Sequence, residues 1–148
     1  MNRRILLAAV FAAALPFHAL AAAPEVFTGI VEGVGAGGYD VVSYFDGTAP
    51  LEGKAEFAMD WKGAAWRFAT QANLDAFKAN PEKFAPQYGG YCAYAVSKGG
   101  TAKGDPLVWT QVDGKLYFNL SSDIKKLWST DIPGNIAKAN ANWPAVLQ

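Results

Sequence analysis

Cys92 is the only cysteine in the sequence, and it directly follows a double glycine and a tyrosine. This pattern predicts a helix over residues 91–98 that Gly89-Gly90 opens and Gly99 closes. A thiol in the first turn of such a helix faces unpaired backbone N–H groups, which favour the reactive, metal-binding thiolate. The alternative is a small buried apolar residue, because free cysteines are among the most buried residue types.

Tyrosines surround this thiol in the sequence and, with the double glycine, suggest a pocket. Phenol groups beside two glycines can line a site in which the backbone approaches a ligand closely. The candidate ligand-binding residues are Tyr88, Gly89, Gly90, Tyr91, Cys92, Tyr94 and Tyr117, with Cys92 as the candidate metal ligand. The spacing of Tyr88, Tyr91 and Cys92 is equally typical of one packed helix face, so a core role is the alternative.

The first 23 residues have the three parts of a cleavable signal peptide. A basic start at Arg3-Arg4 precedes an apolar run over residues 5–15, and small residues precede the predicted cleavage after Ala21 or Ala23. The apolar run is about eleven residues long, whereas a membrane span needs about 20. We therefore expect an exported chain, periplasmic or secreted, with no transmembrane segment after cleavage and a single mature domain over residues 24–148.

The charge and the histidine content exclude two broad classes of function. The sequence has 13 Lys and Arg and 13 Asp and Glu, and removing Arg3 and Arg4 leaves 11 basic against 13 acidic residues. The basic residues are scattered apart from Lys125-Lys126, so we expect no nucleic-acid partner. The single histidine, His18, lies in the predicted signal peptide, which excludes histidine-based catalytic and metal sites in the mature chain. Acid-base chemistry would have to come from a carboxylate, a tyrosine or the thiol, and we expect a non-enzymatic protein.

Two β-hairpins are predicted from their turn residues. Residues 56–61 and 64–68 flank Lys62-Gly63, with alternate apolar side chains on one face. Residues 107–112 and 115–120 flank Asp113-Gly114, a strong hairpin signal. The glycines between residues 33 and 38 lack the features of a phosphate loop and predict a flexible lead-in segment.

Short helices fill the rest of the predicted fold. Thr70 caps a helix that ends at Asn80, and a single turn follows over residues 81–84. Ser122 is predicted to cap a helix that turns Leu127 inward, and a last helix starts near Pro133. We find no linker or internal repeat. The expected class is α+β, with two antiparallel β-hairpins packed with several short helices in a single small domain.

Three segments resemble the exported type of YHS-domain protein: GYDVVSYF at 38–45, WKGAAWRFAT at 61–70 and NLDAFKANPEKFAPQYGGYCAYAVSKG at 73–99. The resemblance places the YHS module at about residues 39–84 and a C-terminal extension at 85–148. It implies a binding module for a metal ion, with copper suggested as the cofactor.

The resemblance also implies three thiolate positions, and they fall on Ser43, Ala69 and Asn73 in this sequence. Soft metals such as Cu(I) select thiolate and thioether ligands, so the implied metal site does not transfer to these positions. A replacement site would need Cys92, together with Met59 or a tyrosine, or with a second chain that meets the first at Cys92.

The sequence thus predicts an exported non-enzymatic binding module for a metal ion or a small ligand. The alternative is an envelope protein-interaction or accessory domain whose aromatic residues form a surface patch. The exposure of Trp128 and Trp143 distinguishes the two hypotheses.

Overall fold

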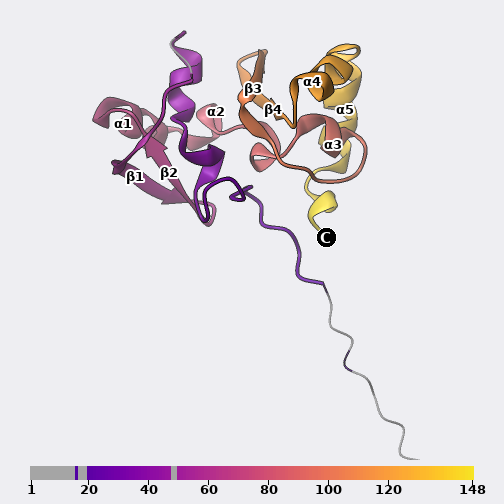
Figure 1. The fold of residues 1–148 in the computed structure, drawn as a ribbon, viewed down its shortest axis with the longest axis horizontal. Helices are drawn as coiled ribbons and strands as arrows, with labels where there is room; N and C mark the ends of the chain where they lie inside the picture. The colour runs from indigo at the N-terminus through magenta and orange to yellow at the C-terminus, as the bar shows by residue number, and fades with distance from the viewer. Residues whose placement is uncertain (1–15, 17–19, 48–49) are drawn as a thin grey trace, which may run out of the picture.

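The computed structural model describes Pro16 and residues 20–47 and 50–148, so most of the predicted signal peptide, residues 1–23, lies outside the described residues. The class is α+β as predicted, with two two-stranded antiparallel sheets and short helices. Figure 1 shows two groups of elements side by side, which we call the N-terminal unit (residues 35–84) and the C-terminal unit (residues 87–142). Of the helices in the described part, none is both long enough and apolar enough to cross a membrane.

The first hairpin forms where the turn residues predict it. Strand β1 spans Lys54–Trp61 and strand β2 spans Ala64–Phe68. Lys62 and Gly63 both have positive φ, 49° and 75°, which matches the right-handed twist of the two strands. Alternate β1 side chains, from Phe57 to Trp61, are half-buried on one face, as expected.

Two helices cover this hairpin. Helix α1 (Gln71–Ala79) begins after Thr70, whose hydroxyl accepts from the Asn73 N–H at 3.1 Å. Helix α2 (Pro81–Phe84) begins after Asn80, whose side chain caps it. Phe77 of α1 is fully buried and packs against Trp66 of β2 with ring centroids 5.4 Å apart.

The second hairpin joins the two hydrophobic clusters of the molecule. Strand β3 (Asp105–Val112) pairs with β4 (Lys115–Asn119) around the predicted Asp113-Gly114 turn. Successive side chains of a strand point to opposite faces. Leu116 and Phe118 accordingly pack into the cluster of the N-terminal unit, whereas Tyr117 packs into the cluster of the C-terminal unit.

Helices α4 (Ser122–Ser129) and α5 (Ile132–Asn142) complete the C-terminal unit and correct two predictions. The cap of α4 is Ser121, whose hydroxyl accepts from the Ile124 N–H at 3.2 Å, and Ser122 is the first helical residue. Leu127, predicted to point inward, is 49% exposed, because fully buried Trp128 takes the core position of this short helix.

The helix predicted over residues 91–98 is shorter than expected. Helix α3 spans Ala93–Ser97, and Gly89-Gly90 belongs to a preceding 3-10 turn, Gln87–Gly90. Tyr88, Gly89 and Gly90 all have positive φ and Tyr91 is extended, so the backbone turns helical only after Cys92. Cys92 is therefore the N-cap residue and does not lie in the first helical turn. Gly99, with φ of 85°, ends the helix as predicted.

The glycine-rich segment at residues 33–38 is packed, which corrects the prediction of a flexible lead-in. Gly35 and Ala36 are buried in a 3-10 turn, Gly35–Gly38. A Cβ atom on Gly35 would contact the indole of Trp66, and the carbonyl of Gly33 accepts from the Ala65 N–H at 2.9 Å. The glycines therefore allow this segment to lie directly against β2.

Candidate functional site

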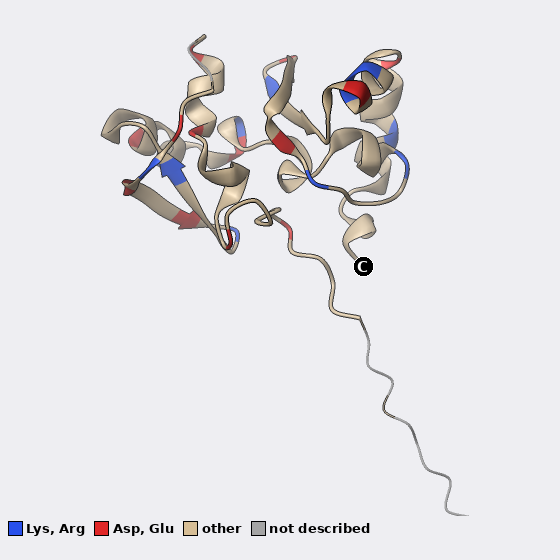
Figure 2. Cartoon of the chain, viewed as in Figure 1, with Lys and Arg blue, Asp and Glu red and all other residues tan. Residues whose placement is uncertain are grey.

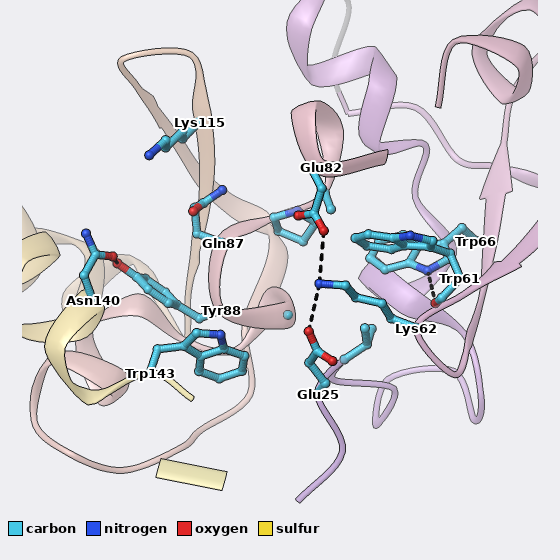
Figure 3. Close-up of a pocket in the computed structure, with 14 residues that line it drawn as sticks. Glu25, Trp61, Lys62, Trp66, Glu82, Gln87, Tyr88, Lys115, Asn140 and Trp143 are labelled. Atoms are coloured by element: carbon cyan, nitrogen blue, oxygen red, sulfur yellow. Dashed lines mark hydrogen bonds and ion pairs between the residues drawn. The ribbon is translucent and has the colours of Figure 1, made fainter. Parts of the chain in front are cut away.

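A cleft of about 410 Å³ is formed by residues of both units and of the N-terminal segment. In Figure 3 the labelled side chains of the N-terminal unit lie across the cleft from those of the C-terminal unit. The cleft-lining residues are Glu25, Val26, Trp61, Lys62, Trp66, Glu82, Ala85, Pro86, Gln87, Tyr88, Gly89, Lys115, Asn140 and Trp143. The volume lies within the range of small-molecule sites, and about half of the lining residues carry polar or charged side chains beside the aromatic ones.

Lys62 carries the positive charge on one wall of the cleft. Its ammonium group lies 2.8 Å from a carboxylate oxygen of Glu25 and 3.2 Å from one of Glu82 (Figure 3). It also lies 4.8 Å from the ring centre of Trp61. The hydrogen bond to Glu25, more than the other contacts, raises the pKa of Lys62. Lys62 thus joins three segments, the residues before the N-terminal unit, the β1-β2 turn and α2.

Replacing Lys62 with methionine should loosen the N-terminal segment while costing less than about 1 kcal/mol of unfolding free energy, because this ion pair is partly exposed. A raised lysine pKa stabilises the fold below the unfolded-state value of about 10.5, and this contribution is lost as pH rises through the folded-state value. The wild-type chain should therefore lose this small contribution in strong alkali, and Lys62→Met should not.

The measurements are urea unfolding against pH and hydrogen exchange at the Phe27 amide, which donates to the Gly89 carbonyl at 2.9 Å. Lys126→Met is the matched control, since among the described residues Lys126 pairs with Asp123 alone, 3.5 Å away on an exposed surface. Equal exchange at Phe27 in wild type and Lys62→Met would contradict the role of Lys62.

Tyr88 forms part of the opposite wall, and its side chain contacts Asn140 and Trp143. Its hydroxyl donates to the Asn140 side-chain oxygen at 2.8 Å, and its ring centre lies 5.9 Å from that of Trp143. Its backbone is left-handed, with φ of 57°, which is uncommon for a residue other than glycine. Burial raises the pKa of the phenol, so Tyr88 is a hydrogen-bond donor at neutral pH and does not act there as a base.

Gly89 lies where the backbone comes closest to the N-terminal segment. Its φ is 60°, and a Cβ atom here would overlap the carbonyl oxygen of Glu25. Only glycine fits both the backbone conformation and the space. The close approach keeps Glu25 at the edge of the cleft, within reach of Lys62.

Tyr88 and Gly89 are the sequence-predicted candidates that line the cleft. The other candidates lie outside its lining: Gly90, Tyr91, Cys92, Tyr94 and Tyr117. The Tyr91 hydroxyl donates to the Pro24 carbonyl at 2.8 Å, and the Tyr117 ring stacks 5.5 Å from that of Trp128. Burial raises the pKa of both phenols. These two tyrosines use their side chains in packing and internal hydrogen bonds.

The Cys92 thiol is fully buried, with a relative exposure of 0%. It donates to the side-chain oxygen of Asn119 at 3.5 Å, and the same oxygen accepts from the Tyr94 N–H at 3.1 Å. Contact between two chains at Cys92 would require this region to open. Within the part of the chain that the structure describes, no group of three His, Cys, Asp or Glu residues is placed to hold a metal ion.

The buried thiol should react with Ellman's reagent at least about 100-fold more slowly in the native protein than in guanidinium, because reaction requires local unfolding. The measurement is the absorbance of released thionitrobenzoate over time. If the native protein reacts rapidly with the reagent, the Cys92 thiol is accessible and can serve as a ligand or a dimerisation residue.

Asp40 is a fully buried carboxylate away from the cleft. One of its oxygens accepts from the Val42 and Ser43 N–H groups, and the other accepts from the Ala69 N–H at 2.8 Å and the Asn73 amide at 2.7 Å. Ser43, Ala69 and Asn73 are the positions to which the resemblance assigns thiolates. In this chain all three surround one carboxylate and donate hydrogen bonds to it.

Most of the cleft was not predicted from the sequence. The sequence pattern places Lys62 in a turn. The residues beside Glu25, Glu82 and Asn140 in the sequence do not indicate a binding site. These residues come from four separate segments, and only the packing of the two units brings them together. Figure 2 shows basic and acidic residues interspersed along the chain in both units, which fits the scattered charge of the sequence.

The α+β fold with its cleft can now be compared with known proteins. The family model described as the YHS domain matches residues 41–88. No curated protein and no solved structure gave a match. The matched segment begins at the 3-10 helix Val41–Phe45 and ends at Tyr88 in the cleft, so the first part of the fold is similar to a YHS domain. The resemblance had placed this module at about residues 39–84.

Proposed function

We propose that the protein is an exported, non-enzymatic binding module that holds a small organic molecule in the cleft. The observation that carries this proposal is the cleft itself, about 410 Å³ with Trp61, Tyr88 and Trp143 among its lining residues. Trp61 and Trp143 are both half-buried, so part of each indole is available to a ligand. The signal-peptide pattern of residues 1–23 supports export.

The charges of the cleft suggest the class of ligand. Glu25, Glu82 and Lys62 give one wall a formal charge of −1, and Lys115 gives the opposite wall +1. The lining is therefore neutral in sum but polarised across the cleft. A zwitterion with a flat ring satisfies both features, because its carboxylate can approach Lys115, its ammonium group the glutamates and its ring the indoles.

The metal alternative has less support from the described residues. Cys92, the proposed thiolate ligand, is buried outside the cleft against Asn119. Met59, the proposed thioether partner, packs against the hydrophobic cluster of the N-terminal unit and does not line the cleft either. The cleft itself contains Glu25 and Glu82, and Lys62 already pairs with both. Two carboxylates are fewer than the three or four protein ligands that a zinc site typically has.

The surface-patch alternative is also less favoured. Among the described residues, the exposed large apolar side chains are all aliphatic, and Leu107 and Leu127 are the most exposed within the folded units. Trp128 is fully buried, and half-buried Trp143 faces the cleft (Figure 3). The aromatic residues therefore line a cleft and a core, and they do not form a patch.

Titration with three probes tests the proposal. We expect L-phenylalanine, a zwitterion, to shift the NMR signals of the Trp61 and Trp143 indole N–H groups. Phenethylamine and 3-phenylpropionate each lack one charge and should bind about fivefold more weakly, as expected for the loss of one exposed ion pair. Equal binding of all three probes would contradict the ligand class, and no shift with any of them would contradict binding of such molecules in the cleft.

A further inference from the structure

The C-terminal unit repeats the order of elements of the N-terminal unit, which corrects the expectation that the chain has no internal repeat. Each unit starts with a 3-10 turn at Gly35–Gly38 or Gln87–Gly90. A short helix, a hairpin and two further helices then follow in both units. In Figure 1 the β1-β2 hairpin with α1 and the β3-β4 hairpin with α4 belong to separate halves of the molecule.

The two hairpins have the same strand register: adding 51 to the number of each paired residue in β1-β2 gives a pair in β3-β4. Lys54 pairs with Phe68, and Asp105 pairs with Asn119. The register then shifts at the same place in both hairpins, so that Ala58 pairs with Arg67 and Trp109 pairs with Phe118. A β-bulge adds a residue to one strand at a defined position. Two unrelated hairpins would not be expected to share both the register and this irregularity.

The starting turns also correspond, with a difference of 52 residues. Ala36 and Tyr88 both have positive φ although neither is glycine, and each carbonyl accepts from the N–H three residues later. The next residues in both turns are Gly-Gly-Tyr. The following position is Asp40 in one unit and Cys92 in the other, and their N–H groups donate to Leu51 and Ala102 respectively.

The helix caps and the cores follow the same correspondence. Thr70 and Ser121 cap α1 and α4, and Asn80 and Asp131 cap α2 and α5. One aromatic contact in each unit joins equivalent positions, 51 residues apart. Trp66 and Phe77 lie 5.4 Å apart at 31°, and Tyr117 and Trp128 lie 5.5 Å apart at 39°.

We propose that residues 87–142 are a second, diverged copy of the N-terminal unit, residues 35–84, which contains most of the segment matched by the YHS model, and that the cleft lies between the two copies. The first copy supplies Lys62 and Glu82, and the second supplies Tyr88 and Lys115. Cys92 occupies the position of Asp40, where a side chain at the N-cap organises the surrounding turn. Cys92 makes no side-chain capping bond, so its role is that of a core residue at the N-cap position, which accounts for its burial.

The environment of Cys92 retains part of the Asp40 arrangement. Tyr94, the counterpart of Val42, still directs its N–H to a side-chain oxygen, here that of Asn119. The Asn119 side-chain nitrogen is buried without a hydrogen-bond partner. With the Asn119 amide rotated, this nitrogen can donate to a carboxylate at position 92, as the Asn73 amide does to Asp40.

The test is Cys92→Asp, with Ala93→Asp as the matched control in the neighbouring, equally buried position. We expect Cys92→Asp to stay folded with a urea midpoint lowered by less than about 1 M, whereas Ala93→Asp should lose its folded spectrum. If Cys92→Asp unfolds as readily as Ala93→Asp, position 92 is not equivalent to position 40 and the assignment of Cys92 is overturned.

A measurement on the wild-type chain tests the repeat without any variant. NMR coupling constants should give positive φ at both members of two pairs, Ala36 with Tyr88 and Lys62 with Asp113. Nuclear Overhauser contacts should place the register shift at equivalent positions in both hairpins. A negative φ at one member of either pair, or hairpins with different registers, would overturn the proposal.

Discussion

Asp40→Ala should lower the free energy of unfolding by about 4 kcal/mol or more, because a buried donor left without an acceptor costs about 1–3 kcal/mol and this carboxylate serves several. The alanine would leave the Val42, Ser43 and Ala69 N–H groups and the Asn73 amide without their acceptor. Urea unfolding followed by tryptophan fluorescence measures the loss.

Asp131→Ala is the matched control, because Asp131 is also an aspartate cap but is exposed and caps through a single Gly134 N–H. Its loss should be about 1 kcal/mol, the usual value for a cap. If Asp40→Ala does not fold, Asp40→Asn retains the volume and should fold with an intermediate loss. Equal small losses for Asp40→Ala and Asp131→Ala would show that the Asp40 hydrogen bonds contribute little.

Gly89→Ala is expected to have the second-largest effect, about 3 kcal/mol, since it combines backbone strain with a steric overlap. The methyl group would overlap the Glu25 carbonyl oxygen, so the N-terminal segment would have to move away from the cleft. The Phe27 N–H would lose its bond to the Gly89 carbonyl, and Lys62 would lose Glu25. Urea unfolding and hydrogen exchange at Phe27 measure the two effects.

Gly99→Ala separates strain from overlap, because Gly99 also has positive φ, 85°, but a methyl group there would extend into open space. It should cost only about 1 kcal/mol, the usual difference between glycine and alanine in this conformation. If Gly89→Ala and Gly99→Ala cost the same, the close approach of Glu25 to Gly89 is not a constraint on the fold.

Features set by neighbouring residues were predicted well. Both hairpin turns, at Lys62-Gly63 and Asp113-Gly114, adopt the expected positive φ values. Thr70 caps α1, and Gly99 ends α3, as predicted. In each case a few consecutive residues determine the geometry, because a turn or a cap requires particular backbone angles and a particular side-chain acceptor.

Features set by residues far apart in the sequence were missed. The double glycine at 89–90 suggested a helix start, but it serves a left-handed turn that packs against the N-terminal segment. The cleft combines Glu25, Lys62 and Tyr88, which share no sequence pattern. The repeat is hard to detect in the sequence because few residues are identical between the two units. The identities in equivalent turns are mainly Gly-Gly-Tyr and the hairpin-turn glycine, and equivalent core positions hold different aromatic residues.

The duplicated unit and the ligand-binding cleft are independent proposals, and the first gives a reason for the second. A duplicated unit explains why a cleft exists at all, since its walls come from the two copies and from the N-terminal segment that Gly89 holds in place. The YHS match starts at Val41 in the first copy and ends at Tyr88, just inside the second, so the matched region includes Lys62 and Glu82 but not Lys115 or Trp143. A complete cleft therefore requires residues on both sides of the boundary of the match.

Native mass spectrometry of the protein purified from its native host tests binding in the cleft most directly. We predict one small organic molecule per chain in the wild-type protein and in Lys138→Trp, a control that adds an indole on the exposed side of α5. Gln87→Trp, which places the same indole in the cleft, should remove the bound mass while the chain stays folded. Retention of the molecule in folded Gln87→Trp, or a bound metal in place of an organic molecule in the wild type, would contradict the account.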